Sequence, residues 1–231
     1  MKSLRLEEWL PIYRRICEDF GFSEEEDLKS AKALADLIGE RSARTLDGLR
    51  EAFPRSVLIC GGGPKLQEEL SSISLDRFVV VADSAASVIL EKDSRTDMIV
   101  TDLDGVIEDQ AELNGRGATV FVHAHGDNQI AIKKYLHFFP GPIVGTCQCA
   151  PPKGLVNFGG FTDGDRAACI CAELGAEKLY LAGFDFENPA EKPGRLSEVK
   201  KRKLAWAKDI MRMLSDDGFQ ILDASSEREL F

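Results

Sequence analysis

The apolar positions of the chain follow two different periods, and the change falls near residue 53. Before it, apolar residues recur every three or four positions, which is typical of amphipathic helices. Gly21 ends the first such stripe, which consists of Trp9, Leu10, Ile12, Tyr13, Ile16 and Phe20. Ser23 and Glu26 then have the spacing of a capping box, and Gly39 suits the end of a second helix. We therefore expect residues 1–52 to form an N-terminal helical subdomain that packs against the main domain or another subunit.

After residue 53, short apolar and β-branched runs alternate with helical patterns. The predicted strands are 56–60, 78–82, 98–101, 119–122, 143–146, 178–182 and 220–222. The predicted helices between them are 64–72, 84–92, 127–138, 163–174 and 196–215. Several strands are apolar at consecutive positions, which is typical of a parallel sheet covered on both faces. Residues 53–231 are thus expected to form an α/β domain with a doubly wound, mostly parallel, Rossmann-like sheet.

Composition narrows the classes of protein that remain. The 231 residues are 44% hydrophobic, which excludes a disordered chain. No apolar stretch approaches the roughly 20 residues that cross a bilayer, and early charges interrupt any signal-peptide core, so a cytoplasmic protein without membrane contact is expected. The net charge of −10 argues against a nucleic-acid partner. It is compatible with an enzyme that holds magnesium through carboxylates.

The six cysteines do not indicate a disulfide framework, because nothing marks the chain as secreted. Two pairs have C-x-C spacing, which differs from the C-x-x-C of common metal and redox motifs. We interpret all six as buried apolar thiols, and a redox or metal role stays open. They are Cys17, Cys60, Cys147, Cys149, Cys169 and Cys171.

In a doubly wound sheet, ligands bind beyond the carboxyl ends of the strands. The first predicted strand is followed by Gly61-Gly62-Gly63-Pro64-Lys65. Glycines let the backbone approach a phosphate, and the free N–H groups of a helix start attract anions. The segment is neither a Rossmann fingerprint nor a P-loop. We interpret it as a loop that contacts phosphate or another ligand; a tight turn is the alternative.

Carboxylates follow the second and third predicted strands. Asp83 and Ser84 come after residues 78–82, where Asp83 taken alone is best interpreted as a helix N-cap. Asp102 and Asp104 follow residues 98–101 and would point to the same side of an extended segment. Such crowding of two negative charges is costly without a cation, and Mg²⁺ prefers hard oxygen ligands. This pair is the strongest indication of a metal site; an Asp-Gly turn is the alternative.

The fourth predicted strand leads into His123-Ala124-His125-Gly126-Asp127-Asn128. Three interpretations stay open. The two histidines with Asp127 could bind a transition metal. Asp127 or Asn128 could cap a helix. Alternatively, Asp127 joins the magnesium cluster and His125 contacts the substrate.

Later segments add acids, glycines and aromatic rings at the same edge. Residues 158–166 include Asp163, Asp165 and Arg166, and residues 182–186 include Asp185. Phe158, Phe161, Phe184 and Phe186 could form a wall for a flat heterocycle, or simply belong to the core. The basic residues Arg195, Lys200, Lys201, Arg202 and Lys203 are interpreted as a solvated helix face, with a grip on phosphates as the alternative. Acids at five strand ends together imply a metal and a polyphosphate.

The combined motifs resemble the archaeal 6-hydroxymethyl-7,8-dihydropterin pyrophosphokinase family, which is similar to the catalytic domain of thiamin pyrophosphokinase. The segments that carry the resemblance are 61–64, 82–83, 99–105, 123–128, 160–166 and 182–185. Ser84 departs from the pattern because Gly is common there.

The resemblance implies magnesium-dependent transfer of diphosphate from ATP to the pterin hydroxymethyl group, with release of AMP, in synthesis of a tetrahydromethanopterin-type cofactor. It implies Asp83, Asp102, Asp104 and Asp127 as metal and phosphate ligands, with Asp163 and Asp165 beside the substrate. His125 or a carboxylate would take the hydroxyl proton. The nucleotide-contacting set is completed by Gly61, Gly62, Gly63, Lys65, Ser84, Asn128, Arg166 and Asp185.

Two other function classes stay open at this point. A nucleotide-sugar glycosyltransferase could use the Asp-x-Asp pair with a metal. A non-catalytic nucleotide-binding module is the other, although the third glycine of a dinucleotide fingerprint is missing. The N-terminal helices could also support a homodimer.

Overall fold

The computed structural model describes residues 3–187 and 197–231, and within them a single sheet of seven parallel strands. The strands are β1 (Ser56–Cys60), β2 (Phe78–Ala82), β3 (Met98–Thr101), β4 (Thr119–Ala124), β5 (Ile143–Cys147), β6 (Lys178–Ala182) and β7 (Gln220–Asp223). The helices that follow β1 are α4 (Leu66–Glu69), α5 (Ala85–Glu91), α6 (Ile107–Gly115), α7 (Gln129–Tyr135), the 3₁₀ turn η1 (Leu136–Phe138), α8 (Asp163–Leu174) and α9 (Ser197–Asp216).

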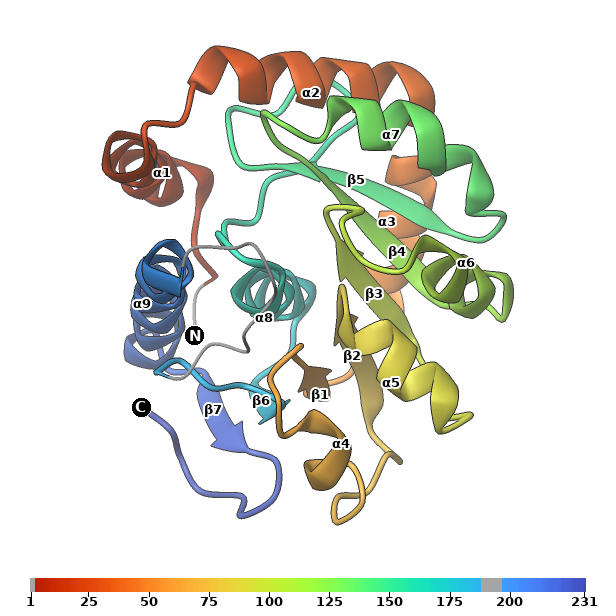
Figure 1. Ribbon diagram of the computed structural model, residues 1–231, viewed down its shortest axis with the longest axis vertical. Coiled ribbons are helices and arrows are strands. Elements are labelled where there is room, and N and C mark those ends of the chain that lie inside the picture. Colours follow the sequence, from red (N-terminus) through yellow and green to blue (C-terminus); the bar gives the residue numbers. More distant parts are fainter. Residues whose placement is uncertain (1–2, 188–196) are drawn as a thin grey trace.

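The strand order is β5-β4-β3-β2-β1-β6-β7. The chain therefore runs from β1 outward to β5 and then returns to the other side of β1. Helix α8 packs over β1, β2 and β3, whereas α5 and α6 lie on the opposite face (Figure 1). This confirms the predicted doubly wound, Rossmann-like sheet, and it puts the reversal of strand order between β1 and β6, where such sheets bind ligands.

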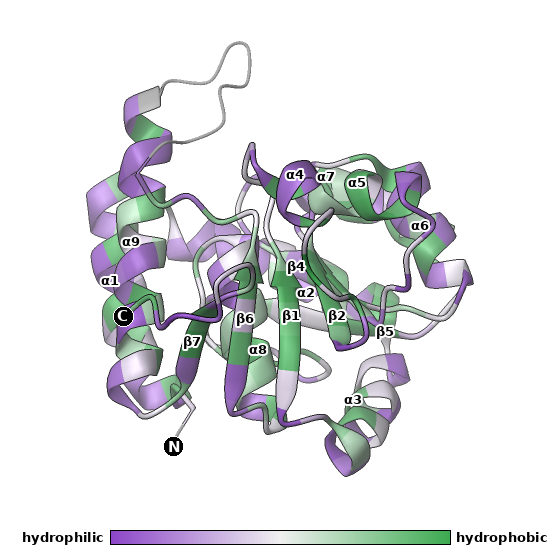
Figure 2. Ribbon diagram, turned by 90° about the horizontal axis from the view of Figure 1, so that it is seen from below, coloured by the Kyte–Doolittle hydropathy of each residue, from purple (hydrophilic) through white to green (hydrophobic). Residues whose placement is uncertain are grey.

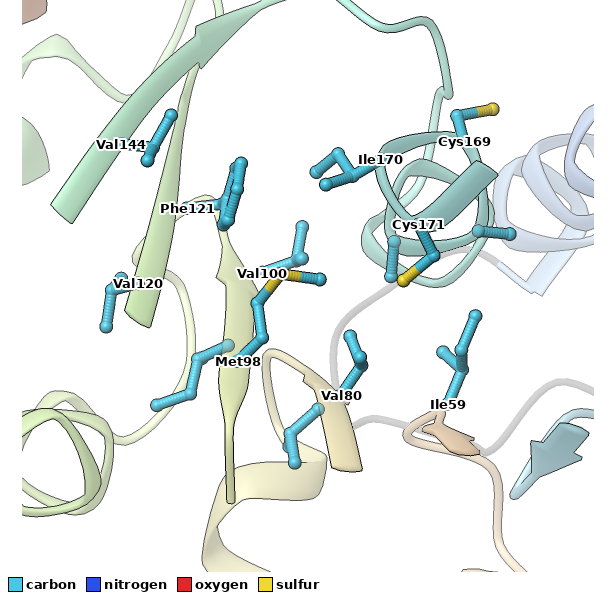
Figure 3. Packing of buried hydrophobic residues seen from close by; sticks show 14 of the residues in the cluster. Ile59, Val80, Met98, Val100, Val120, Phe121, Val144, Cys169, Ile170 and Cys171 are labelled. Carbon is cyan, nitrogen blue, oxygen red and sulfur yellow. The ribbon is translucent and has the colours of Figure 1, made fainter. Parts of the chain in front are cut away.

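Burial on both faces explains the continuous apolar runs of the strands. Figure 2 shows β1 and β6 as largely hydrophobic ribbons among helices of mixed character. In Figure 3, Ile59, Val80 and Val100 of three neighbouring strands lie on the side of the sheet that faces Ile170 and Cys171 of α8, and all five are fully buried. All six cysteines are buried and unpaired, as predicted.

The N-terminal residues form α1 (Leu6–Phe20), α2 (Glu24–Ile38) and α3 (Arg41–Ala52). Gly21 and Gly39 end the first two helices, and the Ser23 hydroxyl caps α2 by accepting from the Glu26 N–H. Helices α2 and α3 pack against β5, and α2 also reaches β4 (Figure 1). The fully buried Trp9 donates to the Gln148 carbonyl, 2.8 Å away, so these helices share the core of the sheet.

Two predicted helices differ from the structure, and one helix was not predicted. The helix expected over 64–72 is only α4, so Pro64 and Lys65 lie in a turn. The helix expected over 127–138 begins at Gln129 and tightens into η1. Helix α6 was not predicted because its buried face is not a continuous apolar stripe. Two of its buried positions are Gln110 and Asn114, whose side chains form hydrogen bonds inside the protein. None of the helices in the described residues has the length and apolar content needed to span a bilayer.

Candidate active site

The strand ends open into a cavity of about 1110 Å³. Its walls include the segments that follow β1, β2, β3, β4 and β6, together with the start of α8. Residues of the N-terminal helices and of α9 complete it, among them Phe20, Phe22, Asp27, Arg202 and Lys203. The sequence motifs therefore meet at one place, as the strand-end rule predicts.

Asp83, Asp102 and Asp104 form a cluster in which one carboxylate oxygen from each lies within 4.8 Å of the others. Asp83 directly follows β2, and the other two follow β3. Asp83 and Leu103 have φ angles of +40° and +67°, a backbone conformation that non-glycine residues seldom adopt. Strain of this kind concentrates at functional sites, and here it accompanies the convergence of the three carboxylates.

Asp83 is not the helix cap that its sequence position suggested. Ser84 occupies the N-cap position of α5, while the Asp83 carboxylate accepts hydrogen bonds from Thr101 Oγ1 at 2.9 Å and Gln110 Nε2 at 3.0 Å. Burial, reinforced by the charges of Asp102 and Asp104, raises the pKa of Asp83 to about 7. Three oxygen donors that repel one another in a partly buried site fit a hard divalent cation, which would relieve the repulsion.

His125 lies between two carboxylates. Its Nε2 is 3.1 Å from Asp102 Oδ2, and its Nδ1 is 2.6 Å from Asp127 Oδ1. Burial alone would lower the pKa of His125, but the two carboxylates raise it to about 9. The hydrogen bond from His125 lowers the pKa of Asp127 to about 2. Asp127, with a side chain 90% exposed, is therefore the partner of His125, and the structure does not bring it into the three-carboxylate cluster.

His123 occupies the last part of β4 and does not support the transition-metal interpretation. It is 1% exposed, and its Nδ1 lies 3.0 Å from Thr146 Oγ1. Burial keeps the pKa of His123 well below its ordinary value. Within the described part of the chain, no third metal-ligand side chain groups with His123 and His125.

Asn128 holds the 123–128 segment in place. Its Nδ2 donates to the Asp102 carbonyl at 2.9 Å and the His123 carbonyl at 2.7 Å, and its Oδ1 accepts from the His125 N–H at 3.0 Å. Asn128 lines the cavity, but these bonds engage its amide with the backbone. Its evident role is to join the loop after β4 to the loop after β3.

Asp27 of α2 braces the same segment and was missed by the sequence analysis. Its Oδ1 accepts from the Gly126 N–H at 2.6 Å, and its Oδ2 from Tyr13 at 2.5 Å and Gln148 at 2.8 Å. Asp27 is 2% exposed and belongs to the buried face of α2. The sequence did contain a signal for its burial: Asp27 continues the helical spacing of the apolar residues Ala31, Leu34 and Ile38, which places it on the same face of the helix.

Replacing Asp27 by alanine is expected to destabilise the protein by about 3 kcal/mol, because it strands the buried donors of Gly126 and Gln148. Urea unfolding checks this value. Tyr13→Phe, which removes one donor and leaves the carboxylate with its other two, should cost roughly 1 kcal/mol. Equal unfolding midpoints for wild type and Asp27→Ala would contradict the bracing role.

The start of α8 holds the next acids. Asp163 pairs with Arg166 at 2.7 Å, and burial together with the charge of Asp102 raises its pKa well above the ordinary value. Asp165 also lines the cavity, and its predicted place beside the substrate stays a prediction. Asp165 is 1% exposed and accepts hydrogen bonds from Phe161 N, Thr162 N and the Thr162 hydroxyl, so it caps α8.

The glycine segment after β1 is shaped by close packing. A Cβ on Gly63 would lie 2.3 Å from the Gly183 carbonyl oxygen, and one on Gly62 would lie 2.4 Å from Ser84 Oγ. Gly63, which meets backbone, thus requires glycine whether or not a ligand binds, whereas at Gly62 the Ser84 hydroxyl can turn aside. Gly61, Gly62, Gly63 and Ser84 all line the cavity. The helix after this segment, α4, has only four residues, and the predicted phosphate contact of the segment stays a prediction.

Two further residues named in the sequence analysis differ in their position relative to the cavity. Lys65 is exposed and does not line the cavity. Asp185 lines it, and its Oδ1 accepts from the Glu187 N–H at 3.0 Å. Arg195 lies outside the described residues.

A doubly wound sheet with clustered carboxylates at its strand ends defines the class of α/β proteins that bind ligands at this edge. The chain matches the family model described as 6-hydroxymethylpterin diphosphokinase MptE-like over residues 31–191. It belongs to this family, whose curated relatives are diphosphotransferases by name.

Three archaeal relatives carry the name 6-hydroxymethyl-7,8-dihydropterin pyrophosphokinase. The protein of Pyrococcus furiosus is 38% identical, with 93% of this chain and 96% of the relative covered. Those of Methanothermobacter thermautotrophicus and Methanocaldococcus jannaschii are 39% and 37% identical, with 93% and 91% of this chain and 97% and 96% of the relatives covered. Among solved structures, two of the sialyltransferase CstII from Campylobacter jejuni align with TM-scores of 0.36 and 0.38, 13% and 15% identity, 77% and 78% of this chain covered and 83% of each of theirs.

Proposed function

We propose that this protein transfers a diphosphate group from ATP to the hydroxymethyl group of 6-hydroxymethyl-7,8-dihydropterin and releases AMP. The observation that carries the proposal is the cluster of Asp83, Asp102 and Asp104 at the cavity formed by the strand ends. The names of three relatives that align over more than nine-tenths of the chain support the choice of reaction and acceptor.

Asp83, Asp102 and Asp104 would hold Mg²⁺, for which a compact set of carboxylate oxygens is a suitable donor group. Bound there, the metal would neutralise the charge of the polyphosphate and of the transition state. The hydrogen bonds from Thr101 and Gln110 fix the Asp83 carboxylate, and the His125 contact fixes Asp102. The protein thereby positions the phosphates before the reaction begins.

In the proposed step, the hydroxymethyl oxygen of the acceptor forms a bond to the β-phosphorus of ATP. The bond from that phosphorus to the oxygen bridging the α- and β-phosphates breaks, and AMP leaves with the bridging oxygen. A base must take the hydroxyl proton. The carboxylates of the cluster are among the titratable side chains at this part of the cavity that could take it. His125 has a pKa raised to about 9 by its two carboxylate partners, so near pH 7 it is a proton donor and not the base.

The direct test is mass spectrometry of the products formed from ATP, Mg²⁺ and 6-hydroxymethyl-7,8-dihydropterin. We expect AMP and the pterin diphosphate in equal amounts, and loss of both products when EDTA removes the metal. A parallel incubation with nucleotide sugars should release no free nucleotide. Formation of ADP with a pterin monophosphate, or full turnover in EDTA, would contradict the proposal.

A further inference from the structure

Three phenylalanines form an aromatic wall at the mouth of the cavity. Phe20 and Phe22 flank the turn between α1 and α2, and Phe161 precedes α8. The ring centroids of Phe20 lie 5.3 Å from those of both Phe22 and Phe161, and Phe22 and Phe161 are 6.4 Å apart. All three line the cavity. We call Phe20, Phe22 and Phe161 the aromatic wall.

Packing of the core does not account for Phe22. Its neighbours in the wall are largely covered, whereas Phe22 is 40% exposed, on a turn whose conformation is fixed by the Gly21 and Ser23 caps. A ring held on a short capped turn, stacked on Phe20 and open toward a cavity, is the kind of apolar surface that binding sites present to flat ligands.

The aromatic wall is tied to the acidic part of the cavity. The Phe161 carbonyl accepts from Arg166 Nη2 at 2.9 Å, and Arg166 Nη1 reaches Asp163 at 2.7 Å. Lys203 of α9 places its ammonium 5.8 Å from the Phe22 ring centroid and 5.7 Å from that of Phe161. A flat ring on this wall would thus have a cation beside it and carboxylates next to it.

The aromatic wall and the glycine segment come from different elements: the wall is formed by the α1–α2 turn and the segment before α8, whereas the glycine segment follows β1. Helix α2, which begins just after Phe22, packs on β4 and β5, whereas the glycine segment follows β1 and neighbours the end of β6 (Figure 1). In the strand order, β2 and β3, which lead into the carboxylate cluster, lie between β4 and β1. A second aromatic pair, Phe184 and Phe186, follows β6 with ring centroids 5.8 Å apart and also lines the cavity.

This inference rests on the proposed function. In that reaction two flat rings, the adenine of ATP and the pterin, must bind on either side of one carboxylate cluster. We propose that the aromatic wall binds the flat ring of the acceptor, with Phe22 stacking on it, and that the nucleotide ring lies at the β1–β6 side. Adenine is also a flat heterocycle that can stack on phenylalanine, so the experiment must distinguish binding of adenine from binding of the pterin at the wall.

The test compares Phe22→Ala with Phe138→Ala. Phe138 is a matched control because it is 49% exposed, lies in η1 and does not line the cavity. Calorimetry measures the Kd of 6-hydroxymethyl-7,8-dihydropterin with Mg²⁺ and α,β-methylene-ATP present, and separately the Kd of α,β-methylene-ATP with Mg²⁺. Circular dichroism and the melting temperature confirm that both variants fold.

Because Phe22→Ala loses a stacking contact, we expect its Kd for the pterin to rise about tenfold or more. Its Kd for the nucleotide should stay unchanged. Phe22→Trp, which keeps a stacking surface, should restore pterin binding, and Phe138→Ala should match wild type. Unchanged acceptor binding by Phe22→Ala overturns the inference while the proposed function stands. Weakened nucleotide binding alone would assign the wall to adenine and also overturn it. A folded wild type that binds the nucleotide but not the pterin contradicts both.

Discussion

Replacing Asp102 by alanine is expected to reduce diphosphate transfer about a thousandfold or more while the protein stays folded. Asp102 contributes to the carboxylate cluster and also contacts His125 Nε2, so its loss removes a metal donor and one of the two partners of the histidine. The fold should survive because Asp102 is only half-buried and its removal relieves repulsion on Asp83.

Release of AMP, followed by chromatography under saturating ATP, pterin and Mg²⁺, measures this effect. Asp47→Ala is the control, since Asp47 is an exposed acid on α3 that does not line the cavity. Its turnover should equal that of the wild type. Turnover by a folded Asp102→Ala variant within tenfold of wild type would show that the cluster does not hold an essential metal.

The strands could be predicted from the sequence because each is a short apolar run covered on both faces. β1, β2, β3 and β6 have the predicted boundaries, and β4, β5 and β7 extend one or two residues further. Helix α6 was missed for a physical reason. Its buried Gln110 and Asn114 are stabilised by hydrogen bonds to Asp83, Ala118 and Pro142, and periodicity of apolar residues does not register such contacts.

The centre of the site was predictable to the extent that strand ends of a parallel sheet meet at one edge. That rule places Asp83, Asp102 and Asp104 at the same edge of the sheet. The rule does not say what each carboxylate contacts, and the roles of Asp127 at the metal and of Asp165 beside the substrate were implied only by the family resemblance. The structure shows that the first pairs with His125 and the second caps α8.

The strand-end rule could not predict that residues of the N-terminal helices line the cavity and brace the loop after β4. Asp27 and Gly126 are 99 positions apart in the sequence, and their contact depends on the packing of α2 beside α7. Phe22 likewise lines the cavity beside Phe161, which is 139 positions away in the sequence (161 against 22). Such long-range contacts follow from tertiary packing, and a local pattern of residues carries little information about them.

Replacing Asp83 by asparagine is expected to affect stability and activity in opposite directions. In the metal-free protein, Asp83 is 6% exposed and is repelled by Asp102 and Asp104, so removing its charge should raise the melting temperature by a few degrees. The asparagine oxygen can still accept the hydrogen bonds from Thr101 and Gln110. Diphosphate transfer should fall by about a hundredfold or more, because a metal ligand is lost.

Thermal unfolding with and without Mg²⁺ separates these effects. Binding to the folded state alone raises its stability, so Mg²⁺ should increase the melting temperature of the wild type and have little effect on Asp83→Asn. Asp47→Asn, at an exposed position of α3, should respond to Mg²⁺ as the wild type does. If Asp83→Asn melts below the wild type in EDTA, repulsion within the cluster does not limit stability. If it keeps the full Mg²⁺-induced shift, Asp83 is not a ligand, and the metal would have to bind through the pair that follows β3.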